Sequence, residues 1–172
     1  LGDVYKRQTY YGRGPEENYA DRKSGMPLGV YKTTARDSFF PYGRPQDCGN
    51  HEDTRWVAVT DDKGQGLLFG SVGAPFAFSA IPYTTTDLIL ANHPVELPKT
   101  TDKTVLVLSS ATRGLGGASC GPGPMSRDII KANKPYPLSF FMRPVTAKSY
   151  KGEIRVPAAQ LDMTMLTLSL IH

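Results

Sequence analysis

Short runs of β-forming residues, separated by turns and loops rich in Gly and Pro, constrain the fold of this chain more than any other feature. The clearest case is residues 55–60, which are followed by the turn sequence Asp-Asp-Lys-Gly at 61–64 and a returning run at 66–69. This pattern predicts a β-hairpin. Further strands are expected at residues 9–13, 28–32, 39–42, 76–81, 104–108, 136–142 and 154–156.

One short helix is expected at residues 85–92. Thr residues at its start can cap the first turn, Asp87 is favourable there, and Pro94 stops the helix. Together with the strand pattern, this indicates an all-β fold with a single helical element.

Composition excludes several classes of partner. The chain has 172 residues and a net charge of +4, and its longest Lys/Arg run has two residues. A nucleic-acid partner is therefore not expected. No apolar run approaches the roughly 18 residues of a membrane span, so no membrane partner is expected either. Nothing in the sequence indicates a cellular compartment.

Both ends of the chain are expected to be foreign sequence. Residues 3–8 can be encoded by a DNA string whose reverse complement encodes Leu-Ser-Leu-Ile-His, which are residues 168–172. Inverted copies of this kind resemble the transposon ends used in shotgun library preparation. We therefore expect residues 1–8 and 168–172 to be artefacts of cloning or sequencing.

The most specific motif is Tyr-Gly-Arg-Gly-Pro-Glu-Glu-Asn-Tyr-Ala-Asp-Arg at residues 11–22. It closely resembles the Y-G-x-G-P-x-E-N-Y-x-D-R signature in the last domain of the β-galactosidases of glycoside hydrolase family 2. The likeness continues in register over roughly residues 10–144. It includes residues 41–46, 53–56, 78–83, 93–98, 114–117 and 139–140.

This resemblance implies an antiparallel β-sandwich of the galactose-mutarotase-like (supersandwich) type, present here only as its second half and therefore incomplete. Residues 9–145 would form this C-terminal small-chain domain. Residues 146–167 lie beyond the likeness and would be a linker or the start of a further module.

The same resemblance implies that the chain is part of a retaining β-galactosidase, which hydrolyses terminal β-D-galactose from β-galactosides. Such chemistry needs two carboxyl groups about 5–5.5 Å apart. In the family, both are Glu residues on a (β/α)8 barrel that precedes this domain. We therefore expect no catalytic residue here, an inactive fragment, and a role in closing the active-site cleft.

The implied partners are a β-galactoside substrate and the catalytic barrel of the parent chain, and a homo-oligomer is left open. No cofactor and no metal ligand are expected in the fragment, whereas the resemblance allows Mg and Na in the parent enzyme.

Four substrate-binding residues follow from the resemblance. The loop at 14–21 resembles a mobile lid near the substrate, with Gly14 supplying hinge freedom and Glu17 and Asn18 holding the loop. The alternative is that these residues only stabilise a turn. Cys120 occupies the position where many relatives place a Trp that stacks on the sugar, so we expect it to line the pocket with weaker stacking.

A metal site or a disulfide formed by the two cysteines has weaker support from the sequence. Cys48 and His51 have a C-x-x-H spacing that Cys120 and His93 would complete as a metal site, but spacing this loose is poor support. A disulfide between Cys48 and Cys120 is open only if their Cα atoms lie within about 7 Å. Trp56 is expected to pack in the core or between sheets.

Two other functions are kept as alternatives. The first is a stand-alone carbohydrate-binding module of mutarotase-like fold, which exposed aromatic side chains grouped on one sheet face would favour. The second is a structural domain that stabilises oligomer contacts.

Overall fold

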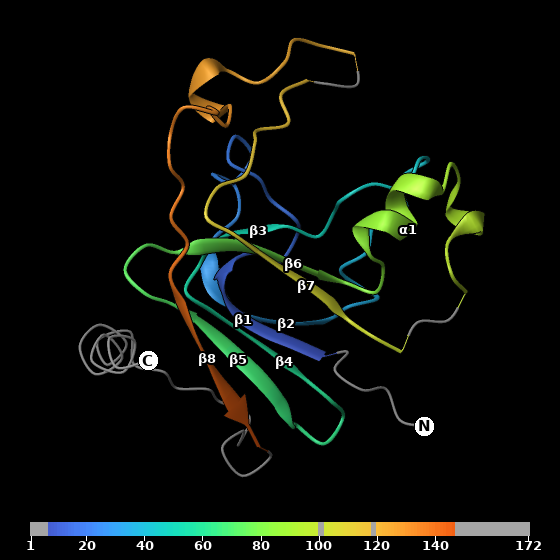
Figure 1. Cartoon of the computed structure of the whole chain (residues 1–172), viewed down its shortest axis with the longest axis vertical. Coiled ribbons are helices and arrows are strands. Elements are labelled where there is room, and N and C mark those ends of the chain that lie inside the picture. Colours follow the sequence, from blue (N-terminus) through green and yellow to red (C-terminus); the bar gives the residue numbers. More distant parts are fainter. Residues whose placement is uncertain (1–6, 100–101, 118–119, 147–172) are drawn as a thin grey trace.

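The computed structural model of the chain describes residues 7–99, 102–117 and 120–146, which form two antiparallel sheets and one short helix (Figure 1). The larger sheet has the order β2 (Leu28–Thr34), β1 (Arg7–Arg13), β4 (Trp56–Thr60), β5 (Gly66–Ser71) and β8 (Phe140–Val145). The smaller sheet has the order β3 (His51–Thr54), β6 (Phe76–Ile81) and β7 (Val105–Ser109). The predicted all-β sandwich is therefore confirmed.

The main core lies between the two sheets. Tyr10 and Val57 of the larger sheet pack with Phe76 and Phe78 of the smaller one, and all four side chains are buried. Because side chains alternate along a strand, the neighbouring residue Trp56 points to the opposite face of the larger sheet. Trp56 is buried there with other apolar side chains, so it is a core residue but does not pack between the sheets.

The larger sheet extends beyond the cover of the smaller one. Phe69 lies opposite Val57 and Met142 lies opposite Phe69, so these side chains share the face that meets the smaller sheet. Met142 nevertheless stays 59% exposed, and its near neighbours Leu67 and Phe140 are exposed as well. An incomplete sandwich is expected to expose apolar side chains of this kind, because part of the inner face of one sheet has no second sheet packed on it.

The helix α1 (Thr85–Leu90) begins where its N-cap predicts and ends two residues before the expected end at residue 92. Thr84 accepts a hydrogen bond from the backbone N–H of Asp87, and the Asp87 carboxylate accepts one from the backbone N–H of Thr84, which makes a capping box. Leu88 anchors the helix in a second apolar cluster with Cys48 and Ile81. Two short 3-10 helices, η1 (Pro94–Glu96) and η2 (Ser126–Asp128), lie in the loops that follow.

The structure corrects several predicted elements. Residues 39–42 are not a strand, because Phe39 and Tyr42 instead pack against the cluster below α1. Strand β3 was missed, since its sequence His-Glu-Asp-Thr is polar. The last strand begins at Phe140 and not at 136. The strand expected at 154–156 lies outside the described residues.

No helix among the described residues is long and apolar enough to cross a membrane.

Candidate functional site

Two loops from distant parts of the sequence meet at one end of the sandwich. The first leaves β1 at residue 14 and carries most of the 11–22 motif, whose first three residues end β1. The second connects β7 to β8 and carries residues 113–124. Figure 1 shows the second loop, in yellow and orange, at the same end of the molecule as the first, in blue. We call them the motif loop (residues 14–22) and the glycine loop (residues 113–124).

Gly14 is required by close packing and not by an unusual backbone angle. A Cβ atom at this position would lie 2.5 Å from Tyr10 Oη and 2.8 Å from the ring of Tyr31. Gly14 is buried, and it has no positive φ. The hinge role predicted for Gly14 remains a prediction, but its contacts show that any side chain here would displace the start of the motif loop.

The carboxylate of Glu17 is held by three donors. Tyr42 donates its phenol hydrogen to Oε1, Tyr19 donates to Oε2 at 3.0 Å, and the backbone N–H of Gly49 donates to Oε2 at 2.7 Å. Burial and the neighbouring Glu17 carboxylate raise the pKa of Tyr42 to about 12 and also raise the pKa of Tyr19. Both phenols therefore stay protonated, and Glu17 ties the motif loop to the 35–50 segment.

Asn18 is fully buried and organises the motif loop from within. Its Nδ2 donates to the carbonyl groups of Arg13 and Glu16, and its Oδ1 accepts from the backbone N–H of Glu52 at 2.8 Å. Its backbone N–H and carbonyl group pair with the backbone carbonyl and the side chain of Asn50. All polar atoms of Asn18 are thus used inside the protein.

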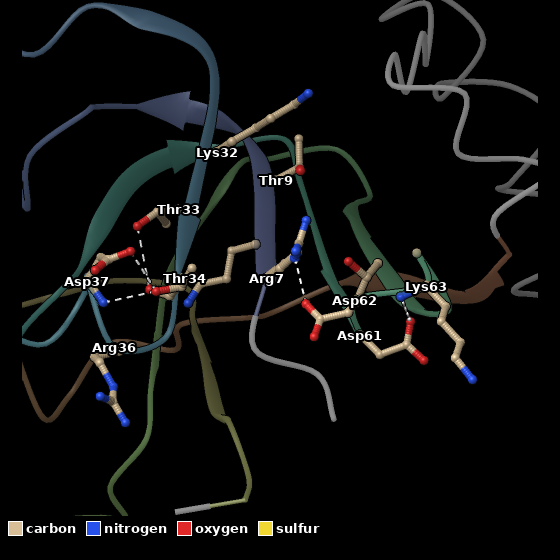
Figure 2. A pocket seen from close by; sticks show the side chains of 13 residues that line it. Arg7, Thr9, Lys32, Thr33, Thr34, Arg36, Asp37, Asp61, Asp62 and Lys63 are labelled. Carbon is tan, nitrogen blue, oxygen red and sulfur yellow. Dashed lines mark hydrogen bonds and ion pairs between the residues drawn. The ribbon is translucent and has the colours of Figure 1, made fainter. Parts of the chain in front are cut away.

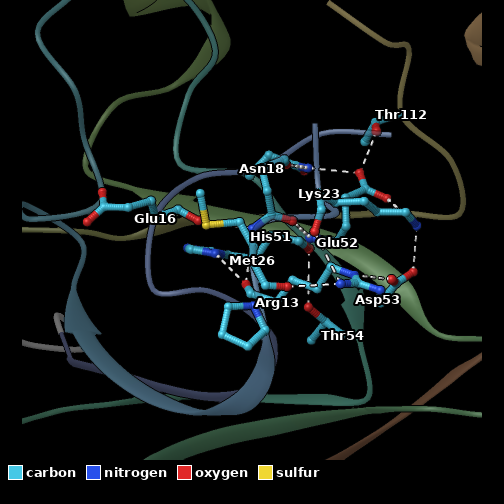
Figure 3. A network of polar contacts seen from close by, with 12 residues as sticks. Arg13, Glu16, Asn18, Lys23, Met26, His51, Glu52, Asp53, Thr54 and Thr112 are labelled. Carbon is cyan, nitrogen blue, oxygen red and sulfur yellow. Dashed lines mark hydrogen bonds and ion pairs between the residues drawn. The ribbon is translucent and has the colours of Figure 1, made fainter. Parts of the chain in front are cut away.

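A charged cluster supports the end of β1 (Figure 3). Asp53 Oδ2 accepts from Arg13 Nε at 2.5 Å, and its Oδ1 accepts from Lys23 Nζ at 2.8 Å. Burial alone would raise the pKa of Asp53, but these two cations lower it below its usual value. Asp53 has a φ of 52°, in the left-handed region, where β3 departs from regular pairing with β6.

Glu52 links this cluster to the segment that leads into the glycine loop. Its Oε1 accepts from Thr112 Oγ1 at 2.5 Å and from Asn50 Nδ2 at 3.0 Å, and its Oε2 lies 4.0 Å from Lys23 Nζ. Because Asn18 bonds the backbone of the same residue, Glu52 joins the motif loop to residue 112 (Figure 3).

Asp21 makes the most direct link between the two loops. Its carboxylate accepts from the backbone N–H of Leu115 at 3.0 Å and from that of Gly116 at 2.7 Å. The Gly116 hydrogen bond is the main reason why the pKa of Asp21 is lowered. Gly114 leaves room for this contact, since a Cβ atom there would lie 2.7 Å from Asp21 Oδ2.

His51 is buried and neutral. Its Nδ1 lies 3.0 Å from Tyr10 Oη and 3.1 Å from the carbonyl oxygen of Arg13. Burial lowers the pKa of His51 to about 4. A carbonyl oxygen only accepts hydrogen bonds, so a proton on Nδ1 suits this geometry. His51 therefore helps to hold the end of β1 in place.

Cys120 lies in a tight turn of the glycine loop, where its backbone N–H donates to the carbonyl group of Gly117 at 3.1 Å, and its side chain is exposed. Cys48 is buried below α1, and both thiols are free, so the disulfide alternative is not realised. Within the described part of the chain, no group of three or more His, Cys, Asp or Glu residues could hold a metal ion.

The structure therefore places the four predicted residues in two touching loops. Gly14, Glu17 and Asn18 belong to one loop and turn their contacts inward, while Cys120 belongs to the other and faces outward. Sequence reasoning missed Asp21 and Glu52 as the connecting residues. The signal for Asp21 was its place within the 11–22 motif, but its partners lie 94 and 95 positions away.

A separate pocket, lined by described residues, lies away from these two loops. It has a volume of about 900 Å³ and opens where β1 begins and β2 ends, beside the turn between β4 and β5 (Figure 2). Its walls are polar and carry charges of both signs, including the Arg7–Asp62 ion pair at 2.8 Å. None of the four predicted residues lines it.

An all-β sandwich whose motif loop and glycine loop are fastened together is the class of structure that these observations define. The sequence model of the family described as "Beta galactosidase small chain" matches residues 1–142. The chain belongs to this family.

Individual relatives agree with the family match. The chain is 43% identical over 138 residues to "Beta-galactosidase BgaC" of Bifidobacterium adolescentis, which covers 78% of this chain and 13% of the relative. It is 37% identical over 147 residues to a "Beta-galactosidase" of Priestia megaterium, covering 84% and 14%. It is also 44% identical over 111 residues to "Beta-galactosidase small subunit" of Latilactobacillus sakei, covering 59% and 34%. The chain thus spans about one seventh of the length of the first two relatives.

Proposed function

We propose that this chain forms one wall of the active-site cleft of a retaining β-galactosidase, which hydrolyses terminal β-D-galactose from β-galactosides. The observation that carries the proposal is the contact between Asp21 and the backbone of Leu115 and Gly116. It joins the motif loop, which holds three of the four expected substrate-binding residues, to the loop that holds the fourth. Loops supported on a rigid sheet are where binding sites are usually built.

The catalytic Glu pair would come from a barrel elsewhere in the parent protein. Three carboxylates near the loops, which are bound to other groups of this chain, support this assignment. Glu17 accepts from two phenols and an amide, Asp53 is paired with two cations, and Asp21 is bound to two amides. A nucleophile or an acid/base must instead be free to contact the substrate and exchange a proton.

Within this wall, the four residues have different roles. Cys120 would offer the sugar a small apolar surface, because its exposed side chain is the one of the four that faces outward. Gly14 would let the motif loop start close against β1 and β2, and Glu17 and Asn18 would keep the loop in shape from inside. The chain would bind no cofactor of its own, and Mg or Na would act in the parent enzyme.

The partners of the chain would be the catalytic barrel and the galactoside. The uncovered apolar face around Met142 supports a role inside a larger protein, since such a surface is costly to leave in water. A homo-oligomer is compatible with the same surface. The alternative of a stand-alone carbohydrate-binding module has less support, because the exposed rings of Phe40 and Phe140 belong to separate parts of the fold.

The proposal is tested by expressing residues 9–167 and measuring galactose binding and turnover of a nitrophenyl galactoside. We expect no turnover, and no binding tighter than about 1 mM, because only one wall of the pocket is present. Tight galactose binding by this piece would favour the binding-module alternative. Turnover by this piece would contradict the absence of catalytic residues.

A further inference from the structure

We infer that Asp21 is a positioning residue that sets galactoside affinity by fixing the glycine loop, and with it Cys120, against the motif loop. This inference rests on the proposed function for its consequence, but its structural half can be tested without any enzyme activity.

The carboxylate of Asp21 fits its partners closely. The N–H groups of Leu115 and Gly116 both point at the Asp21 carboxylate, and Gly116 follows them with a φ of 61°, in the left-handed region. Successive N–H groups arranged in this way form a concave site for an anion. Asp21 supplies that anion, with one carboxylate oxygen on each amide.

Gly114 of the glycine loop leaves the space that the Asp21 carboxylate occupies. The ideal Cβ position of Gly114 lies 2.7 Å from Asp21 Oδ2, so a side chain there would push the carboxylate away. Gly114 also donates its own N–H to the carbonyl group of Asp128 at 2.7 Å, without involving Asp21. Among the described residues beyond Gly116, the backbone hydrogen bonds of the turn run within the loop, as in the contact between Cys120 and Gly117. The position of Cys120 relative to the motif loop therefore depends on Asp21.

A second bridge limits what loss of Asp21 can do. Thr112 binds Glu52, and Glu52 binds Asn18, so residue 112 stays attached to the motif loop when Asp21 is removed. The segment from 115 onward has no such support among the described contacts with the motif loop. Loss of Asp21 should loosen the tip of the glycine loop and leave its base in place.

The first part of the inference, that Asp21 holds the glycine loop, is tested by amide hydrogen exchange in the 172-residue chain. In Asp21→Ala, we expect the amides of Leu115 and Gly116 to exchange at least about tenfold faster, because hydrogen bonds to a charged acceptor are worth about 1.5–3 kcal/mol.

The amide of Gly114 serves as an internal control and should keep its exchange rate, since its acceptor is the carbonyl group of Asp128. Asp21→Asn retains one carbonyl acceptor and should show a smaller change in the same direction. Asp37→Asn, which removes an exposed carboxylate bound to Thr34, is the matched control and should show none.

The second part, that Asp21 sets galactoside affinity, is tested by steady-state kinetics of the same variants in the intact parent β-galactosidase. We expect Asp21→Ala to raise KM for galactosides about three- to tenfold and to leave kcat within about twofold, because binding is lost equally in the ground and transition states. Unchanged exchange at Leu115 and Gly116, or equally faster exchange at Gly114, would overturn the positioning role. Faster exchange with an unchanged KM would overturn the link between Asp21 and galactoside affinity. The contact itself would then stand, and the proposed role of the chain as a pocket wall would be wrong.

Discussion

The phenol of Tyr42 donates a hydrogen bond to the carboxylate of Glu17, across 25 positions of sequence. This contact fastens the motif loop to the segment between β2 and β3, and Gly49 adds a backbone donor from the same segment. The loop that resembles a mobile lid is therefore held on two sides, by Glu17 here and by Asp21 at the glycine loop.

Removing the Tyr42 phenol should destabilise the chain. In Tyr42→Phe, the Glu17 carboxylate loses a donor while half-buried, which is expected to cost about 1–3 kcal/mol of unfolding free energy. Urea unfolding measures the change. Tyr83→Phe is the control, because its half-buried ring packs against Phe39 and its hydroxyl makes no hydrogen bond to a described residue. Equal effects of the two variants would contradict the anchoring role of Glu17.

Gly14→Ala should destabilise the chain by about 1–3 kcal/mol, because the added methyl group overlaps Tyr10 and Tyr31 in a buried position. Gly25→Ala is a matched control, since its Cβ would meet nothing within 4 Å and its φ is not positive. Thermal and urea unfolding of both variants measure the difference. A Gly14→Ala variant as stable as Gly25→Ala would show that the close packing around Gly14 is not needed.

The stability of the chain should depend on His51 between pH 6.5 and about 4. Because burial lowers the pKa of His51 to about 4 from 6.5, the unfolded chain takes up a proton in this window before the folded chain does. Its contribution is complete above pH 6.5 and decreases as the pH falls, by about 3 kcal/mol at most.

Urea unfolding across this pH range tests the His51 prediction. His51→Gln should remove the slope assigned to this residue, and the exposed His93→Gln should keep it. The carboxylates with lowered pKa, such as Asp21 and Asp53, lose their contribution only as the pH falls below 3.8. The same slope in His51→Gln and in the unmodified chain would contradict a neutral, buried imidazole.

Cys120→Trp in the intact parent enzyme should lower KM for galactosides about two- to tenfold, since an aromatic face adds about 0.5–1.5 kcal/mol of stacking. The exposed position of Cys120 leaves space for the larger side chain. Steady-state kinetics with a nitrophenyl galactoside measure the change. An unchanged or raised KM would argue against stacking at this position.

Local sequence signals predicted the elements whose causes are local. Strand β6 has the bounds that its alternating Phe residues indicate, and α1 begins where Thr84 and Asp87 cap it. Polar β3 could not be found in this way, because the partners of its side chains, such as Arg13 for Asp53 and Thr112 for Glu52, come together only in the folded chain. The same holds for the site. The motif identified the loop, but the partners of Glu17 and Asp21 come from residues 42, 49, 115 and 116.

The central claim is that this chain completes a galactoside pocket whose reactive carboxylates lie on another part of the parent protein. It is tested most directly by mixing the purified chain with the remainder of the parent β-galactosidase and following the hydrolysis of a nitrophenyl galactoside. We predict that neither part alone reaches the rate of the mixture, and that the chain alone shows none. Hydrolysis by the chain alone, or a remainder that is fully active without it, would contradict the account.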